Sequence, residues 1–172
     1  MRTARPADHE RVAALTATAY ADHTSPAYQP HLRDVASRAA ATEVLVAELD
    51  GRVVGAVAHV AFTAAPEWRE ILEGPEEVSF RMLAVDPAAQ GYGAGRALVQ
   101  ACLDRARAAG AARVVISTQA SMTAAHALYA SLGFVRLPAR DWSPEPGLLL
   151  WVLGLDLAVL VRPPGPGGAA RP

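Results

Sequence analysis

The sequence predicts a mixed α/β fold, with a mostly antiparallel central sheet of about seven strands and about four helices. Asp50-Gly51 stands between two β-rich runs, residues 44–49 and 53–62, and this dipeptide is preferred in two-residue hairpin turns. A third β-rich run, residues 77–85, ends at a glycine-rich loop, and a helical pattern begins directly after it. Because a hairpin precedes the segments in which helix and strand alternate, the order is not that of a regularly alternating parallel sheet.

The N-terminal segment predicts a short strand followed by a helix. Asp8 is a candidate N-cap for this helix, and Val12, Leu15 and Ala19 share its apolar face. Two prolines then interrupt the pattern, and a second helix is predicted over residues 30–40. Both helices therefore precede the hairpin along the chain.

Two helix–strand units follow the glycine loop. The first helix covers residues 96–109 and ends at Gly110, and residues 112–119 form the next strand. The second helix has Ser121 as its candidate cap and Gly133 as its C-terminal stop. Capping residues and glycines thus set the expected limits of these helices.

The rest of the chain predicts two closing strands and a tail. One strand begins at Phe134, a loop covers residues 138–147, and the last strand covers residues 148–161. Residues 162–172 are too rich in proline and glycine to pack, so we expect a disordered tail there. Residues 1–161 are then expected to form a single domain, in agreement with a length of 172 residues.

The composition is that of an ordinary globular protein, with 52% hydrophobic and 19% charged residues. At a formal net charge of −1, no overall field attracts nucleic acid or an anionic membrane, and neither is expected as a partner. The longest apolar run, residues 147–161, is shorter than the roughly 20 residues of a membrane span. The N-terminal residues lack the apolar core of a secretory signal, so we expect a soluble, cytoplasmic protein.

Cysteine and histidine give little sign of redox or metal chemistry. The single cysteine, Cys102, cannot form an internal disulfide, which fits a reducing compartment. Its apolar neighbours favour a buried structural thiol over a nucleophile. The five histidines show no ligand spacing, so no metal site is predicted.

Gly91, Gly93 and Gly95 alternate at the start of the predicted helix and indicate an anion-binding loop. Backbone N–H groups in such a loop form a nest for an anion, and the helix adds the positive end of its dipole. A Walker loop is excluded, because Gly95 is followed by Arg96 and Ala97 rather than by Lys and Ser or Thr. The dinucleotide fingerprint fits poorly, because the third glycine comes one position early and the next strand ends without an acidic residue.

A third type of phosphate loop matches fully. The stretch "QGYGAG", residues 90–95, has the pattern Q/R-x-x-G-x-G/A, and "AAHALYASLGF", residues 124–134, follows about 30 residues later. Both motifs, with this order of elements, resemble the GNAT acyltransferase superfamily over roughly residues 1–160. The resemblance implies the GNAT fold, with element order β-α-α-β-β-β-α-β-α-β-β. It also implies acetyl-CoA as co-substrate.

The resemblance assigns cofactor contacts to the end of the third β-rich run and to the loop. The pantetheine arm of acetyl-CoA would bind backbone groups of Leu83, Ala84 and Val85, and the pyrophosphate would lie over the loop. Arg96 either adds a charged contact to the phosphates or is merely exposed. Met122 stands where many relatives have an asparagine that touches pantetheine. The loop residues so assigned are Gln90, Gly91, Tyr92, Gly93, Ala94 and Gly95.

The catalytic assignments by resemblance are less complete. Tyr129 aligns with the tyrosine that often protonates the leaving sulfur, although it also fits an apolar helix stripe. Ser117 and Ser79 stand at the positions where two branches of the family carry a glutamate base. Glu77, on the same strand face as Ser79, is the remaining candidate for a base acting through water, the alternative being a solvated strand end. His59 and His126 are further candidates, with a buried and an exposed histidine as the respective alternatives.

Three residues are candidates for binding the acceptor. Arg81 shares the strand face of Glu77 and is suited to an acidic acceptor, or to pairing with Glu77. Asp141 and Trp142 lie where the family builds a wall of its acceptor pocket, and they suit either a cationic amine or a rigid turn.

The prediction is therefore an N-acetyltransferase that moves an acetyl group from acetyl-CoA directly to a primary amine of a small molecule or peptide. The transfer would occur in a ternary complex without a covalent enzyme intermediate. A non-catalytic acyl-CoA-binding or sensing domain of the same fold is the alternative. A homodimer through the apolar final strands is expected by analogy with the fold.

Overall fold

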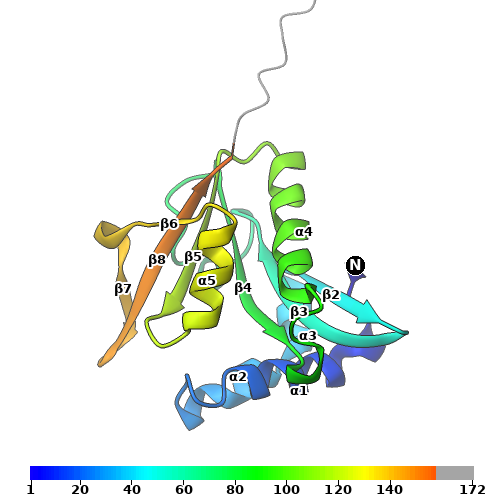
Figure 1. Ribbon diagram of the computed structural model, residues 1–172. Coiled ribbons are helices and arrows are strands. Elements are labelled where there is room, and N and C mark those ends of the chain that lie inside the picture. Colours follow the sequence, from blue (N-terminus) through cyan, green and yellow to red (C-terminus); the bar gives the residue numbers. More distant parts are fainter. Residues whose placement is uncertain (158–172) are drawn as a thin grey trace, which may run out of the picture.

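An eight-stranded sheet forms the centre of the computed structural model, which describes residues 1–157 (Figure 1). The strand order is β1-β2-β3-β4-β5-β8-β6, and β7 also pairs with β8. Every pairing is antiparallel except that of β4 with β5. The strands are β1 (Arg2–Thr3), β2 (Glu43–Leu49), β3 (Arg52–Val60), β4 (Glu77–Val85), β5 (Arg113–Gln119), β6 (Val135–Arg136), β7 (Trp142–Glu145) and β8 (Leu148–Asp156).

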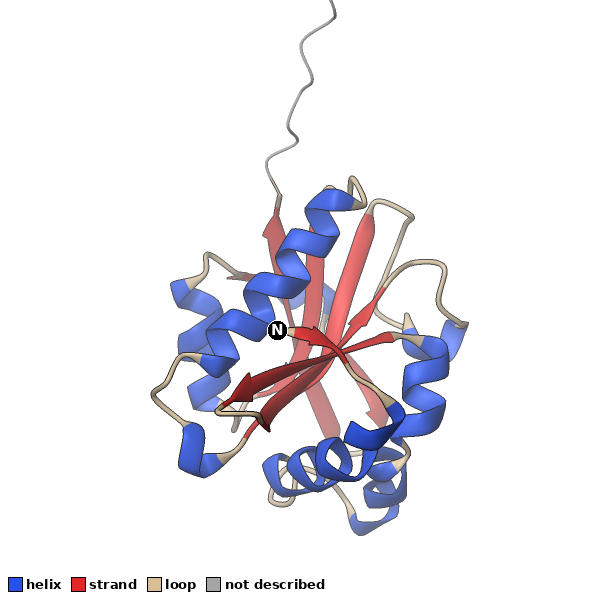
Figure 2. Ribbon diagram, turned by 90° about the vertical axis from the view of Figure 1, so that its right-hand side faces the viewer, coloured by secondary structure: helices blue, strands red, loops and turns tan. Residues whose placement is uncertain are grey.

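Helices cover both faces of the sheet (Figure 2). One face carries α4 and α5, and the other carries the three N-terminal helices. The mixed α/β class, the mostly antiparallel sheet and the helix-strand order agree with the prediction, with one strand and one helix more than expected. The helices are α1 (His9–Ala19), α2 (Gln29–Arg33), α3 (Val35–Ala41), α4 (Ala94–Ala108) and α5 (Thr123–Ser131).

Two predicted elements differ from the structure. The single helix expected over residues 30–40 is broken at Asp34, whose carboxylate accepts the Ser37 N–H at 3.0 Å and starts α3 as a new helix. The loop expected over residues 138–147 contains β7, because residues of this segment pair with the first half of β8. The last strand is described as far as Asp156, and the predicted tail lies outside the described residues.

Two predicted helix caps are also wrong in detail. Asp8 directly precedes α1, but its carboxylate binds the Arg2 guanidinium and the Arg5 N–H rather than the first turn of the helix. Met122, not Ser121, is the residue that precedes α5, and no side chain caps that helix. The glycine stops are confirmed, because Gly110 and Gly133 have φ of +74° and +92° just beyond α4 and α5.

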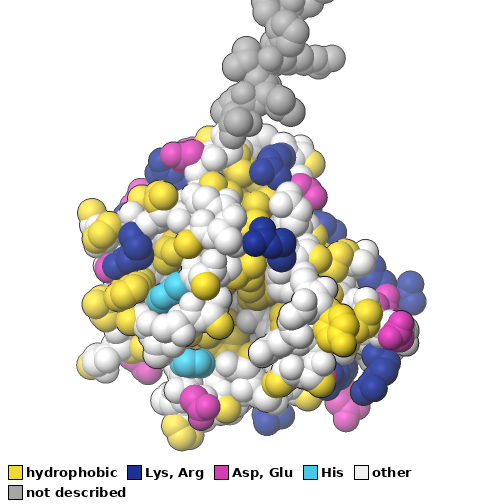
Figure 3. Space-filling view, viewed as in Figure 1, with side chains coloured by type: hydrophobic (Ala, Val, Ile, Leu, Met, Phe, Trp, Pro, Cys, Tyr) yellow, Lys and Arg dark blue, Asp and Glu magenta, His cyan; other side chains and the backbone are white. Residues whose placement is uncertain are grey.

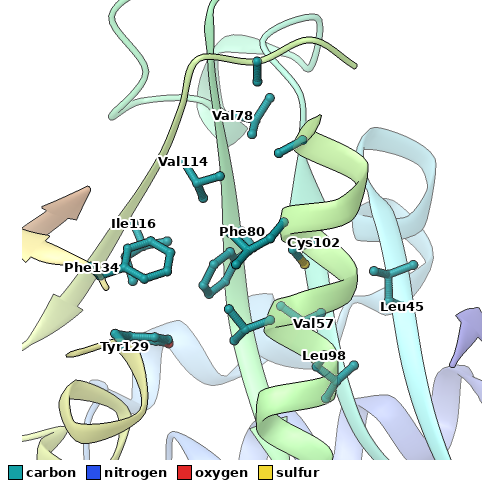
Figure 4. Close-up of a cluster of buried hydrophobic side chains, with 14 of the residues drawn as sticks. Leu45, Val57, Val78, Phe80, Leu98, Cys102, Val114, Ile116, Tyr129 and Phe134 are labelled. Carbon is teal, nitrogen blue, oxygen red and sulfur yellow. The ribbon is translucent and has the colours of Figure 1, made fainter. Parts of the chain in front are cut away.

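The main core lies between the sheet and the helices α4 and α5 (Figure 4). Phe80 of β4 packs among Tyr129 and Phe134, with ring centroids 5.8 and 6.1 Å away. Cys102 is 1% exposed in this core, and burial raises the pKa of its thiol to about 12, as expected of a structural thiol. A second core joins α1 and α3 to the opposite face of β2, β3 and β4.

Strands β4 and β5 pair only at one end. Their parallel register covers Glu77–Ser79 against Arg113–Val115, and both strands then continue without pairing to each other. They spread apart toward the lower half of the ribbon view (Figure 1). A bulge against β3 lies in the separated part of β4, and Met82 there has φ of +54°. The sheet is therefore open along one side of β4.

Candidate active site

The loop after β4 has the backbone form that its glycines predict. Gly91 and Gly93 adopt φ of +84° and +80°, a backbone conformation that residues with a Cβ rarely adopt. A Cβ at either position would meet no atom within 4 Å, so the space over the loop is empty. Gly93 is also the N-cap of α4 and supplies no side chain to the first turn. The N–H groups at the start of α4 can therefore hold an anion, and the helix dipole favours one there.

This loop borders a hollow of about 750 Å³ between α4 and α5, and hydrophobic side chains line it (Figure 3). The hollow brings together three separate predicted parts: the end of β4, the glycine loop and the start of α5. A pantetheine-like chain, which is long and largely apolar, is the kind of group that such a lining accepts. The predicted cofactor residues that line it are Leu83, Val85, Gln90, Gly91, Gly93, Ala94, Gly95, Arg96 and Met122.

Two other predicted cofactor residues lie elsewhere. Tyr92 is 74% exposed and its side chain does not line the hollow. The Ala84 side chain is buried in the core on the α1 side, and only its backbone is near the opening. Because β5 has separated from β4 here, backbone N–H and C=O groups on that edge of β4 have no strand partner. These groups can bind the amides of a ligand lying between the strands.

Arg96 and Arg11 fix the helices around the loop. Arg96 is exposed at the start of α4 and donates to the Ser131 hydroxyl of α5 at 2.7 Å. Arg11 of α1 forms an ion pair with Asp86, the residue that follows β4. Asp86 in turn accepts the Ala88 N–H at 2.9 Å, which holds the entry to the glycine loop.

Tyr129 extends from α5 toward β4, beside the rings of Phe80 and Phe134 (Figure 4). The residue is 7% exposed, and its hydroxyl has no hydrogen-bond partner within residues 1–157. Burial, followed by the effect of Tyr20, raises the pKa of this phenol well above its usual value. The phenol therefore stays protonated at neutral pH and is available as a hydrogen-bond donor.

Glu77 lies at the closed end of the β4–β5 pair, about 20 Å along β4 from Leu83 at ~3.3 Å per residue. Both of its carboxylate oxygens accept hydrogen bonds from Arg140, at 2.7 and 2.8 Å, and one also accepts the Glu73 N–H. Burial alone would raise the pKa of Glu77, but these donors outweigh burial and hold it below its usual value. The carboxylate is neither solvated nor free, so its geometry is that of a structural ion pair.

Asp141 and Trp142 are likewise held by structural contacts. Asp141 accepts two hydrogen bonds from Arg136, at 2.6 and 2.7 Å, and a third from the Val152 N–H. The Arg136 contact lowers the pKa of Asp141 to about 2. Trp142 packs in a small cluster with Val115 and Val152, and its buried indole N–H has no hydrogen-bond partner in the described part of the chain. Neither side chain lines the hollow.

The two candidate histidines have different surroundings. His59 is buried, which was the structural alternative for this residue, and burial lowers the pKa of its ring. His126 stacks on Trp151 at a centroid distance of 5.3 Å and is half-buried rather than exposed. Within residues 1–157, no group of three or more His, Cys, Asp or Glu side chains is arranged to hold a metal ion.

An aromatic and basic cluster beside the open end was not predicted. Arg81 of β4 lies over Trp68, His31 stacks on Trp68 at 5.4 Å, and Tyr28 lies 4.9 Å from His31. Only Arg81 was singled out from the sequence. The other members come from short helical turns: His31 lies in α2, whereas Tyr28 and Trp68 lie in single 3-10 turns before β2 and between β3 and β4. The aromatic residues of these short turns were the signal in the sequence that could have indicated the cluster.

The comparisons with known proteins agree with this geometry. Residues 10–134 match the model of the acetyltransferase (GNAT) family. The chain belongs to the acetyltransferase (GNAT) family. Rat N-acetylaspartate synthetase is 37% identical over 105 residues, which are 61% of this chain and 32% of that protein. A mycothiol acetyltransferase from Sanguibacter keddieii is 32% identical over 142 residues, 79% of this chain and 43% of that protein. The chain thus spans less than half the length of these curated relatives.

Solved structures of the GNAT family share the fold over nearly the whole chain. A GCN5-related N-acetyltransferase from Kribbella flavida has a TM-score of 0.67 and 26% identity, covering 91% of this chain and 96% of its own. A putative acetyltransferase from Salmonella typhimurium, solved with its cofactor acetyl-CoA, has a TM-score of 0.64 and 24% identity, covering 96% and 97%. The fold prediction is confirmed. None of the helices in residues 1–157 combines the length and apolar character needed to cross a membrane.

Proposed function

We propose that this protein is an N-acetyltransferase that uses acetyl-CoA and an amine acceptor in a ternary complex. The observation that carries the proposal is the union of the glycine cradle, the apolar hollow and the unpaired edge of β4 in one continuous site. Family membership and the acetyl-CoA complex of the Salmonella typhimurium protein support it. The named activities of the relatives, N-acetylaspartate synthesis and mycothiol acetylation, suggest small amine acceptors.

The glycine loop would hold the pyrophosphate. Its fit rests on the empty space above Gly91 and Gly93 and on the uncapped start of α4. The backbone of Leu83, Ala84 and Val85 would bind the pantetheine amides between the separated strands. When bound, acetyl-CoA supplies a thioester whose acetyl group passes to the amine while the sulfur leaves as a thiol.

Tyr129 would donate its phenolic proton to the leaving sulfur, and the proton that the attacking nitrogen loses would return to the phenolate, directly or through solvent. Its protonated state at neutral pH and its lack of another partner within the described residues favour this role. We do not retain Glu77 as the base, because Arg140 engages both of its oxygens. We propose instead that the amine enters in its neutral form, so kcat/KM should rise with pH toward the pKa of the acceptor itself.

Titration calorimetry with acetyl-CoA tests the cofactor assignment. The wild-type protein should bind in the micromolar range, and Gly93→Glu should abolish binding because a carboxylate would fill and repel the phosphate position. Gly51→Glu is the matched control: Gly51 also has positive φ, +75°, and open space around it, but it lies in the β2–β3 turn. Absence of binding to the wild type would refute the proposal.

Release of free thiol with a library of amines then tests catalysis. Turnover that is lost in Tyr129→Phe separates an enzyme from a non-catalytic acyl-CoA-binding domain. Acetyl-CoA binding without turnover of any amine would favour the binding domain.

We also propose a cytoplasmic location and a homodimer. The apolar side chains of Val135 on β6 and Leu149 on β8 are 61% and 54% exposed near the outer edge of the sheet, which supports an interface there. Sedimentation equilibrium of the wild type and of Val135→Asp tests the dimer. A monomeric wild type would contradict it.

A further inference from the structure

The strongest unassigned feature is the basic and aromatic cluster beside the open end of β4. Arg81 lies just before the bulge, on the face of the sheet opposite α4 and α5. Its guanidinium carbon is 5.7 Å from the ring centroid of Trp68, against which His31 stacks. The cluster therefore borders the part of β4 where β5 has moved away, next to the residues assigned to the pantetheine.

The charge of Arg81 is only partly compensated. Nη1 donates to the carbonyl oxygens of Glu67 and Trp68, at 3.1 and 3.4 Å, and to Glu70 Oε2 at 3.5 Å. Its other two guanidinium nitrogens donate to no acceptor within residues 1–157. The Glu70 side chain is 39% exposed, so solvent screens this long contact and it compensates the charge of Arg81 only weakly.

A second arginine adds to the positive potential from beneath. Arg38 is 1% exposed and forms no ion pair with a carboxylate of residues 1–157. Its nitrogens donate to Leu32 O at 2.6 Å and, at 3.4 Å, to His31 O and Thr16 Oγ1, while its buried Nε has no partner among residues 1–157. Buried charges are ordinarily paired, and this one has no counterion within the described residues.

The charges of Arg81 and Arg38 affect the pKa values of titratable groups around the cluster. Partial burial, followed by Arg81 and Arg38, lowers the pKa of His31. Burial raises the pKa of Tyr20 to about 12, with Arg81 acting in the opposite direction. Tyr20 also contributes to the raised pKa of Tyr129. The cluster and the Tyr129 phenol thus share one electrostatic neighbourhood, in which the acidic groups are Glu70 at the rim and the exposed Asp34.

We infer that the acceptor is a small amine that also carries a carboxylate, and that the Arg81 guanidinium binds this carboxylate. Guanidinium and carboxylate match in a two-pronged geometry, and Trp68 gives the guanidinium a flat support. Arg81 is two residues from Leu83, about 7 Å along the strand. A molecule the size of an amino acid can therefore place its carboxylate at Arg81 and its amine near the thioester. This inference rests on the proposed acetyl transfer.

The test is thiol release with matched amines. The first set of amines, the acidic arm, carries a free carboxylate: glycine, β-alanine, L-aspartate and L-glutamate. The second set, the neutral arm, consists of their methyl esters, in which the carboxylate is blocked. Putrescine and spermidine form a cationic arm. Wild type, Arg81→Gln and Arg81→Lys are compared, with Arg107→Gln as matched control, because Arg107 is exposed near the far end of α4 and pairs only with Asp104.

At least one amine of the acidic arm should be used, with kcat/KM roughly 10- to 100-fold above its ester. Arg81→Gln should remove that preference, Arg81→Lys should restore part of it, and Arg107→Gln should retain it. Acetyl-CoA affinity should be unchanged in all variants, which shows that they fold. Equal or better use of esters or polyamines would overturn the inference while the proposed function stands. Turnover of no amine with acetyl-CoA still bound would overturn it together with the proposed catalysis, and failure to bind acetyl-CoA would refute the cofactor assignment as well.

Discussion

The two ends of the β4–β5 pair place charged and polar side chains in opposite circumstances. At the closed end, Glu77 is hydrogen-bonded to Arg140, and Arg113 pairs with Asp156. At the open end the strands separate, and within the described residues the edge of β4 has no strand partner there. The Tyr129 hydroxyl and two of the three guanidinium nitrogens of Arg81 have no hydrogen-bond partner within these residues. A carboxylate on β4 is thus structural when the strands meet around it. Groups near the separation are left available for ligands.

The largest effect should follow from breaking the closed end. Glu77→Ala leaves Arg140, whose side chain is 14% exposed, without its buried partner. Removing one member of a buried ion pair typically costs 3–5 kcal/mol, so we expect a loss of about that size in the free energy of unfolding. Urea denaturation measures it, with the exposed neighbour Glu76→Ala as control. A Glu77→Ala protein of normal stability but without turnover would restore Glu77 as the base.

The next effect belongs to the open end. Tyr129→Phe should lower kcat about 100-fold, because the donor to the leaving sulfur is lost, whereas acetyl-CoA affinity should stay the same. Stability should change little, since the hydroxyl makes no hydrogen bond within residues 1–157. Stopped-time thiol assays and urea denaturation of the same samples separate the two quantities. If Tyr129→Phe lowered the free energy of unfolding enough to account for its loss of activity, the role of Tyr129 would be in packing alone.

The sequence predicted the open end much better than the closed one, for a physical reason. Phosphate binding requires glycines at fixed spacing, so residues 90–95 and the strand and helix around them are visible as a pattern. Ion pairs such as Glu77–Arg140 join residues 63 apart in the chain, and the spacing carries no sign of them. The same holds for Asp141, for which the sequence left a substrate contact and a rigid turn as alternatives and gave no sign of its ion pair with Arg136. In the aromatic and basic cluster, Arg81 lies on a strand, whose alternation predicts its face, whereas the other members lie in short helical turns that give no such pattern.

A smaller effect concerns pH at the closed side of the sheet. The pKa of Asp141 is about 2 in the folded protein, held down mainly by Arg136, against an ordinary value of 3.8. Its contribution to stability is therefore complete above about pH 4 and is lost as the pH falls toward about 2. Melting temperatures measured across this range should fall less steeply for Asp141→Asn than for the wild type. Asp22→Asn, an exposed substitution, should retain the wild-type slope.

The smallest expected effect is a difference in salt dependence between the open and the closed end of the β4–β5 pair. Arg96 is exposed at the start of α4, where its charge would act on the pyrophosphate through solvent. Arg96→Gln should weaken acetyl-CoA binding only about threefold to tenfold, because exposed charge pairs contribute about 1 kcal/mol. Added salt should reduce the difference between the two proteins, since the Debye length falls from ~10 Å at 0.1 M to ~3 Å at 1 M.

The same salt series should leave the closed end nearly unchanged, because the buried Glu77–Arg140 pair is screened much less. Calorimetry at several salt concentrations measures the first response, and urea denaturation the second. If Arg96→Gln binds acetyl-CoA like the wild type at every salt concentration, Arg96 is an ordinary exposed helix residue held by Ser131. The N–H groups of the glycine loop would then hold the phosphates alone, by geometry rather than by net charge.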